Sequence, residues 1–220
     1  MRASSLRFAS RTLKTVQWQS SSRLGCSRLY SAASTDQIGE GRTYYSLFPK
    51  TLKDGPPPKG PFAINNRELR REFLELQSQN HPDLARSEAE KESSDKISSE
   101  INKAYSTLSS VLHRATYLLE LHGLTLAEDA GRTMPQDPEL LMEVYDVLED
   151  IEECETDDEV ERIQEQVTEK IADAEKRVEQ VFDTNDLENA QQAVTVLRYW
   201  VNIKDSLKEW EPGRPFRMIH

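Results

Sequence analysis

The sequence predicts an all-α fold, and two observations support this. Apolar residues recur every third or fourth position in successive segments between residues 65 and 201, which is the period of one buried helix face. Glycine is scarce, with 8 residues in a chain of 220, whereas leucine, glutamate, alanine and lysine, which favour helices, are common. A chain of this length provides one or two small domains.

The first 35 residues differ in composition from the rest of the chain. They contain six arginines and lysines and many serines, and the first acidic residue is Asp36. An arginine-rich segment without an apolar central region is typical of a mitochondrial transit peptide, not of a secretory signal. We therefore expect residues 1–30 to be an import leader cleaved after Tyr30, and the mature protein to lie in the mitochondrial matrix. The alternatives are a basic disordered tail and plastid import, which fits less well because arginine is so prominent.

Charge and cysteine content exclude several classes of function. The formal net charge is −11, which argues against nucleic-acid binding because proteins that bind phosphates usually carry a basic surface. No run approaches 18 apolar residues, so no membrane-spanning helix is predicted. Cys26 belongs to the leader, which leaves Cys154 alone in the mature chain. A zinc site built from cysteine pairs and an intrachain disulfide are therefore excluded, and we expect no cofactor.

The mature chain begins with an aromatic segment, Tyr44–Phe48, that predicts a short helix. The connector Asp54–Pro61 is rich in proline and glycine and fits neither a helix nor a strand interior. Asn65 and Asn66 are good N-caps for the next helix. That helix has apolar residues at positions 69, 73 and 76 and a mixture of arginines and glutamates elsewhere.

A proline-containing turn, His81-Pro82-Asp83, separates this helix from the next. Proline has no N–H and disfavours the α conformation in the preceding residue, so the chain must turn here and two antiparallel helices follow. The second helix is predicted from about Glu88 to Ser109. A shorter helix follows over Val111–Leu121, with Gly123 in the position just after its C-cap.

The last part of the chain predicts three further helices. Residues 124–136 form a linker, and Asp137 and Pro138 provide an N-cap and a first-turn proline. Thr156 and Glu159 predict a capping box for the second helix, and Asn185 is the predicted cap of the third. Their core stripes are, for the first helix, Leu140, Val144, Val147, Leu148 and Ile151; for the second, Val160, Ile163, Val167, Ile171, Ala174, Val178 and Val181; and for the third, Leu187, Ala190, Val194, Leu197 and Val201.

Several apolar side chains lie off these stripes. On a wheel at about 100° per residue, Leu141, Met142 and Tyr145 fall well round the first of these helices. On the third, Tyr199 lies about 200° from the core position Leu197 and is expected to face away from the core. A helix with its core already supplied has no packing need for a second apolar patch, and such patches often mark partner sites.

The His81-Pro82-Asp83 turn at the tip of a helical hairpin, preceded by an aromatic helix, resembles the J-domain of DnaJ-type co-chaperones. The segment Ala115–Gly123 is similar to the end of the J-domain in the HscB family, the J-proteins of iron–sulfur cluster assembly. The sequences Leu141-Met142-Glu143 and Leu197-Arg198-Tyr199 also align with that family. The likeness extends over residues 42–210, and the absence of an N-terminal cysteine-pair zinc module is typical of the fungal and bacterial forms.

The resemblance implies an L-shaped arrangement of a J-domain hairpin at 42–123 and a three-helix bundle at 137–210, followed by a tail at 211–220. It implies no enzymatic activity of the chain itself, which would activate the ATPase of a mitochondrial DnaK-type heat-shock chaperone. The residues implied to contact that ATPase are His81, Pro82, Asp83, Arg67, Arg70 and Arg71. The residues implied to bind an IscU-type scaffold protein are Leu141, Met142, Tyr145, Asp146, Glu149 and Tyr199.

Four alternatives remain beside this interpretation. The arginines of the hairpin can equally form a solvated face stabilised by i,i+4 pairs. Leu141, Met142 and Tyr145 can widen the core or contact the J-domain. The chain can be a general mitochondrial DnaJ-type co-chaperone for folding or import, in which case the off-core apolar patch is not needed. An enzyme that uses His81 and Asp83 as an acid–base pair is disfavoured, because a proline-locked surface turn provides no pocket to orient a reacting group.

Overall fold

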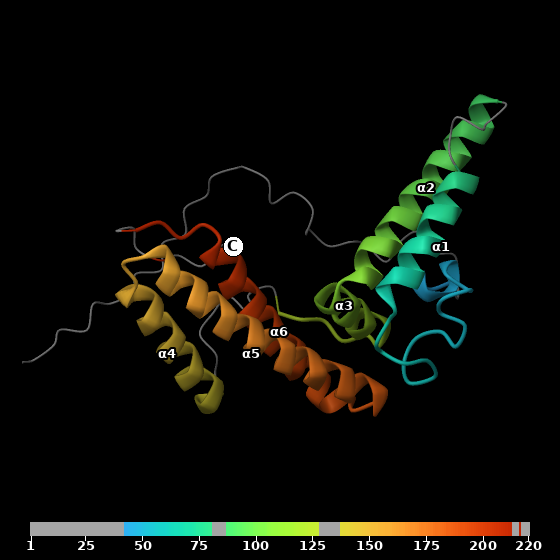
Figure 1. Cartoon of the computed structure of the whole chain (residues 1–220). Coiled ribbons are helices and arrows are strands. Elements are labelled where there is room, and N and C mark those ends of the chain that lie inside the picture. Colours follow the sequence, from blue (N-terminus) through green and yellow to red (C-terminus); the bar gives the residue numbers. More distant parts are fainter. Residues whose placement is uncertain (1–41, 81–86, 128–136, 213–215, 217–220) are drawn as a thin grey trace, which may run out of the picture. The chain divides into compact units, whose positions relative to one another are not determined.

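The computed structural model describes residues 42–80, 87–127, 137–212 and 216, and all regular structure within these ranges is helical. The predicted all-α fold is therefore confirmed. The predicted leader, the His81-Pro82-Asp83 turn and most of the predicted linker lie outside the described residues. The helices of Figure 1 are, in chain order, η1 (Tyr44–Leu47), α1 (Asn66–Gln79), α2 (Glu88–Ser109), α3 (Val111–Leu121), α4 (Pro138–Glu153), α5 (Asp157–Asp183) and α6 (Leu187–Leu207).

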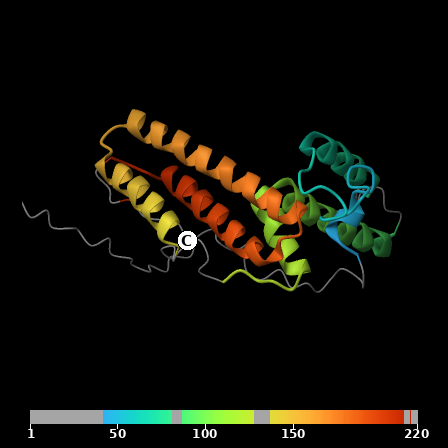
Figure 2. The ribbon, with the colours of Figure 1, turned by 90° about the horizontal axis from the view of Figure 1, so that it is seen from below.

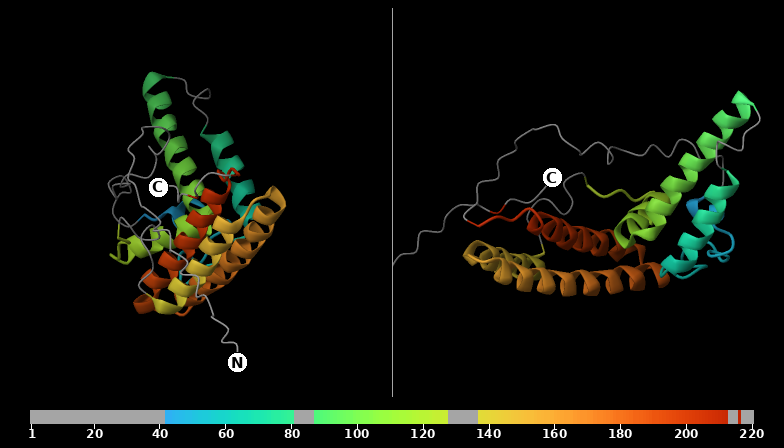
Figure 3. Two further views of the ribbon diagram at one scale, coloured as in Figure 1. Left: turned by 90° about the vertical axis from the view of Figure 1, so that its left-hand side faces the viewer. Right: turned by 45° about the horizontal axis from the view of Figure 1, so that its top comes forward.

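Helices α1 and α2 form a hairpin. They lie side by side, as Figure 1 and the right panel of Figure 3 show. Helix α1 begins after the N-cap Asn65, whose side chain accepts hydrogen bonds from two backbone N–H groups of the first turn. Leu69 is fully buried, and the rings of Phe73 and Tyr105 stack with centroids 4.2 Å apart. The apolar stripe predicted for α1 therefore packs against α2.

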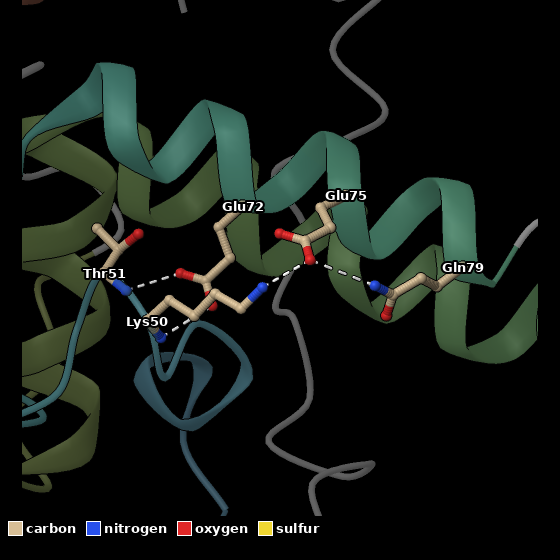
Figure 4. A network of polar contacts seen from close by, with 5 residues as sticks. All are labelled: Lys50, Thr51, Glu72, Glu75 and Gln79. Atoms are coloured by element: carbon tan, nitrogen blue, oxygen red, sulfur yellow. Dashed lines mark hydrogen bonds and ion pairs between the residues drawn. The ribbon is translucent and has the colours of Figure 1, made fainter.

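The connector between η1 and α1 is held by one buried carboxylate. Glu72 accepts hydrogen bonds from the backbone N–H groups of Lys50, at 2.9 Å, and Thr51, at 2.8 Å (Figure 4). Glu75 lies at the surface, where it pairs with the Lys50 ammonium at 2.6 Å and accepts a longer hydrogen bond from Gln79. Glu72 thus satisfies two main-chain donors that have no partner in a regular helix.

The end of α3 has the geometry that the sequence predicted. Gly123 lies just beyond the C-cap with a φ of +73°, a left-handed conformation that glycine adopts without a Cβ clash. Its N–H donates to the carbonyl of Glu120 at 3.0 Å, and the N–H of Leu124 donates to that of Leu119 at 2.8 Å. These two bonds make a Schellman motif, which satisfies carbonyls that the end of the helix would otherwise leave free.

Arg114 on α3 lies at the centre of a buried cluster. Its guanidinium lies 4.6 Å from the centroid of the Phe62 ring, and its Nη1 donates to the carbonyl of Leu108 at 2.7 Å. Phe62 also stacks on Phe182 of α5, with centroids 5.4 Å apart, and donates its N–H to the carboxylate of Asp183 at 2.7 Å. This cluster therefore joins four segments, namely the connector before α1, the end of α2, helix α3 and the end of α5.

Helices α4, α5 and α6 form the predicted three-helix bundle, seen from below in Figure 2. Helix α4 has Asp137 as its N-cap and Pro138 in its first turn, as predicted. Thr156 and Glu159 form both hydrogen bonds of a capping box at the start of α5, which confirms that prediction as well. Along α5 the predicted stripe is buried except Ile171, which is half-buried.

The connection between α5 and α6 differs from the prediction by one residue. Asp186, not Asn185, is the N-cap of α6, and its side chain accepts a hydrogen bond from the N–H of Asn189. Asn185 has a φ of +56° and instead ends α5, because its N–H donates to the carbonyl of Phe182 at 3.2 Å and the N–H of Asp186 donates to that of Val181 at 2.7 Å. Asparagine tolerates this left-handed conformation better than most side chains, and that is the property the prediction overlooked.

Helix α6 is buried over a wider sector than its predicted stripe. The prediction that Tyr199 faces away from the core is wrong, because only 1% of this residue is exposed. Its neighbour Trp200 is buried too, whereas Val201, a predicted core residue, is half-buried. Helix α6 packs against α3 as well as α5, and Tyr145 of α4 lies close enough to Tyr199 to affect its pKa, so a wheel built on one contact underestimates the buried sector.

The Glu72 carboxylate provides a stability test. The variant Glu72→Gln keeps the shape of the side chain but removes its charge and one acceptor, so one backbone N–H loses its partner. We expect the free energy of unfolding in a urea titration to fall by about 1.5–3 kcal/mol. The matched control Glu75→Gln removes only an exposed ion pair and should cost at most about 1 kcal/mol. Equal losses in the two variants would contradict this account of Glu72.

Tyr199 and Tyr145 provide a second test, because one ring is buried and the other is 55% exposed. Tyr199→Ala leaves a cavity in the bundle, and we expect it to lower the free energy of unfolding by about 3–5 kcal/mol. Tyr145→Ala should change it by no more than about 0.5 kcal/mol. Thermal and urea unfolding followed by circular dichroism measure both, and a Tyr199→Ala variant as stable as the wild type would show that this ring is not part of the core.

Candidate functional site

The first candidate site is the solvent face of α1, which leads toward His81. That residue, with Pro82 and Asp83, lies outside the described residues, so the face is defined by the arginines that precede them. Side chains 67, 70 and 71 are all exposed and fall within about 100° of one another on a helical wheel. Among the described residues none of the three takes part in an ion pair, so the i,i+4 pairs of the alternative interpretation are not found.

Leu74 lies in the middle of this arginine face and was not identified from the sequence. It is 56% exposed, whereas the apolar stripe of the same helix is turned toward α2. A leucine among three unpaired guanidinium groups offers apolar contact area inside a basic rim, which is the usual composition of a docking surface. The signal was present in the sequence, because Leu74 lies about 140° from Leu69 on the wheel.

The second candidate site is a patch on α4. Met142 is 69% exposed and Tyr145 is 55% exposed, while Leu141 at the edge of the patch is half-buried. Asp146 and Glu149 are exposed beside them, as the sequence predicted. These two large apolar side chains are not used in the core, so the alternative in which they widen the core fails for Met142 and Tyr145.

The surroundings of the α4 patch are strongly acidic. Helix α4 contains seven aspartates and glutamates and no lysine or arginine. One of the seven, Glu143, is neutralised by Lys170 of α5 at 2.8 Å, and that ammonium also lies 5.9 Å from the centroid of the Trp200 ring. The patch therefore suits a partner surface that combines apolar side chains with basic ones, because charge complementarity guides association.

Tyr199 belongs to this site in a different way from the one predicted. Burial raises the pKa of its hydroxyl to about 12, and the nearby Tyr145 adds to the rise. The phenol therefore stays protonated at any physiological pH. Since the Tyr199 ring is buried while Tyr145 is exposed, Tyr199 offers a partner almost no surface of its own.

Metal binding and thiol reactivity find no support among the described residues. No group of three or more histidine, cysteine, aspartate or glutamate side chains in the described ranges is placed to hold a metal ion. Cys154 is half-buried, and burial together with Glu159 and Asp150 raises the pKa of its thiol, which disfavours the reactive thiolate. None of the described helices has the length and apolar character required to cross a membrane.

Comparison with known proteins identifies the C-terminal bundle. A family profile described as the HSCB C-terminal oligomerisation domain matches residues 136–208, which include α4, α5 and α6. The match therefore covers the helix with the acidic patch.

Similarity to known proteins also extends beyond residues 136–208. The mitochondrial J-type co-chaperone JAC1 of Saccharomyces cerevisiae is 34% identical over 182 residues, which is 81% of this chain and 94% of the yeast protein. The human iron–sulfur cluster co-chaperone protein HscB is 33% identical over 149 residues, 67% of this chain and 63% of the human one.

Two solved structures have the same fold. The crystal structure of human co-chaperone protein HscB superimposes with a TM-score of 0.67 and 30% identity, covering 78% of this chain and 83% of that one. The Jac1 co-chaperone from Saccharomyces cerevisiae gives a TM-score of 0.63 and 29% identity, covering 78% of this chain and 98% of that one. The chain therefore belongs to the HscB/Jac1 family of J-type co-chaperones.

Proposed function

We propose that the chain is a mitochondrial iron–sulfur cluster co-chaperone that acts in the matrix. It binds an IscU-type scaffold protein, delivers it to a DnaK-type heat-shock chaperone and stimulates the ATPase of that chaperone, which promotes cluster transfer. Membership of the HscB/Jac1 family supports this function, as does the arginine-rich composition of residues 1–30. One chain that holds both partners raises the effective concentration of the scaffold at the ATPase, so two weak interfaces are sufficient.

The scaffold-binding part of the proposal rests on the exposed patch of α4. Met142 and Tyr145 offer large apolar surfaces that the fold does not use, with Leu141 at the edge. Asp146 and Glu149 add charge on the same side of the helix. An interface of this kind draws most of its affinity from a few large side chains, and its charged rim governs the rate and specificity of association.

The ATPase-stimulating part of the proposal assigns contact roles to His81, Pro82 and Asp83. The arginine face of α1 supports it, because Arg67, Arg70 and Arg71 are exposed and unpaired within the described chain and can meet an acidic surface. The chain performs no covalent chemistry. It stimulates hydrolysis by binding one conformation of the ATPase more tightly than another, which shifts the population toward that conformation.

A general DnaJ-type co-chaperone for folding or import is the second candidate. It shares the turn and the arginine face but has no use for the patch on α4. The match of residues 136–208 to the HSCB C-terminal domain favours the iron–sulfur function over this candidate, since that match covers α4 and its patch.

The turn is tested by His81→Gln. We expect this variant to lower the stimulated rate of ATP hydrolysis by a DnaK-type ATPase more than about tenfold. A tenfold change in rate corresponds to about 1.4 kcal/mol of transition-state stabilisation. Single-turnover hydrolysis of ATP by the partner measures the effect. The control His122→Gln changes an exposed histidine at the end of α3 and should stimulate as the wild type does. If His81→Gln stimulates normally, the chain does not act as a J-protein.

The patch is tested by combining Leu141→Ala with Tyr145→Ala. Removal of two contact side chains should weaken binding of an IscU-type scaffold by about 30-fold or more, since the few dominant residues of an interface contribute about 2 kcal/mol or more each. Stimulation of the ATPase in the absence of scaffold should not change. The control Leu121→Ala removes a large exposed side chain from α3. Scaffold binding as tight as that of the wild type would favour the general co-chaperone.

A further inference from the structure

The side chain of Gln77 in α1 makes three hydrogen bonds to α2. Its Nε2 donates to the backbone carbonyl of Ser98 at 3.2 Å and to the Oδ1 of Asn102 at 3.0 Å, and its Oε1 accepts from the Ser98 hydroxyl at 2.7 Å. Both amide hydrogens and the amide oxygen are thus used. The orientation of the amide is fixed, because a flipped group would place its oxygen against the Ser98 carbonyl, which cannot donate.

These bonds lie where the apolar packing of the hairpin ends. No side chain from Gln77 to Asn80 is buried, and neither is any described side chain from Glu88 to Glu100. Ile97, the isoleucine next to Ser98, is 41% exposed. The nearest buried apolar contact of α2 is made by Ile101, one turn further from the tip. The relative position of α1 and α2 in this stretch is therefore set by polar contacts and not by burial.

Polar contacts hold two helices differently from apolar ones. Burial of apolar surface has no direction, so an apolar pair tolerates a small rotation or sliding of one helix on the other. A side chain with all its hydrogen bonds satisfied permits one register, and any slip leaves donors or acceptors without partners. The Gln77 amide is therefore suited to fix geometry, even though its half-exposed bonds contribute little to stability.

We infer that Gln77, Ser98 and Asn102 form a polar clamp that positions the two helix ends between which the His81-Pro82-Asp83 turn is attached, and so sets how strongly the chain stimulates its ATPase partner. The inference rests on the proposed function of that turn. Gln77 precedes His81 by four residues in the sequence, and it shares α1 with the arginine face. The three clamp residues are positioning residues, since their effect reaches the partner through the turn and the arginines.

The experiment compares Gln77→Leu with Gln79→Leu. Both place a leucine in the last turn of α1, but Gln79 is exposed and makes only a 3.5 Å hydrogen bond to Glu75. We expect Gln77→Leu to lower the maximal stimulated rate of the DnaK-type ATPase by about three- to tenfold, the loss that follows when one or two aligning hydrogen bonds disappear. The concentration that gives half-maximal stimulation and the urea midpoint should stay close to those of Gln79→Leu.

Rescue at the partner position separates positioning from general packing. Asn102→Asp retains an oxygen that accepts from the Gln77 amide, and we expect it to stimulate nearly as the wild type does. Asn102→Leu has no acceptor and should show the same loss as Gln77→Leu, and the double variant with Gln77→Leu should lose little more. A merely structural role would instead lower the urea midpoint in parallel with the rate.

The outcomes distinguish this inference from the proposal on which it depends. If His81→Gln loses stimulation while Gln77→Leu and Asn102→Leu match the wild type, the turn acts as proposed and the clamp does not position it. If the clamp variants lose rate only in proportion to their stability, the inference is also overturned. If His81→Gln stimulates normally, both the proposed function and the inference fail.

Discussion

The contact on which most of the described structure depends is the burial of the Arg114 guanidinium. Only 4% of this residue is exposed, and it touches or faces groups from three other parts of the chain. The Leu108 carbonyl at the end of α2 accepts its hydrogen bond, the Phe62 ring lies against it, and Glu175 and Glu179 of α5 lie near enough to raise its pKa. Burial lowers that pKa more than these carboxylates raise it, but a guanidinium stays charged throughout the accessible pH range.

A buried charge of this kind favours one arrangement of its neighbours. Removal of a guanidinium from water costs several kcal/mol unless it is paired. Here the Leu108 carbonyl accepts from Nη1, whereas the buried Nε has no partner among the described residues, so few positions of α3 keep even this hydrogen bond. The Leu108 carbonyl is among those that a helix end leaves without partners, and a cation there also interacts favourably with the helix dipole. Phe62 and Asp183 extend the same cluster to the end of α5. The Arg114 cluster therefore fixes the positions from which α1 and α6 begin.

The two candidate surfaces carry opposite charge, and this has a consequence for partner choice. The exposed face of α1 presents three arginines around Leu74, whereas α4 presents Met142 and Tyr145 among carboxylates. Each surface offers apolar side chains, so burial alone would not distinguish their partners. Like charges brought together across an interface are strongly unfavourable, and a partner suited to one surface is therefore excluded from the other.

Most local features were predictable, although the N-cap of α6 was placed at Asn185 and not at Asp186, and contacts between helices were not predictable. The bounds of α2, the capping box at Thr156 and the turn at Gly123 depend on residues close together in the sequence, and all were predicted from it. The burial of Tyr199 depends on a second helix packing against α6, and the clamp at Gln77 depends on the register between two helices. A pattern within one segment contains neither kind of information.

The burial of Tyr199 also changes how mutations of the α4 patch should be understood. Its hydroxyl is protonated and close enough to Tyr145 for that residue to affect its pKa, yet the ring offers almost no accessible surface. A partner that docks on α4 therefore meets Met142 and Tyr145 directly and has almost no access to Tyr199. Loss of binding on truncating Tyr199 would reflect lost stability, because removal of a buried ring leaves a cavity into which the neighbouring helices relax only partly. The energy of the contact itself can be measured only at the exposed side chains of α4, whose removal leaves the core of the bundle intact.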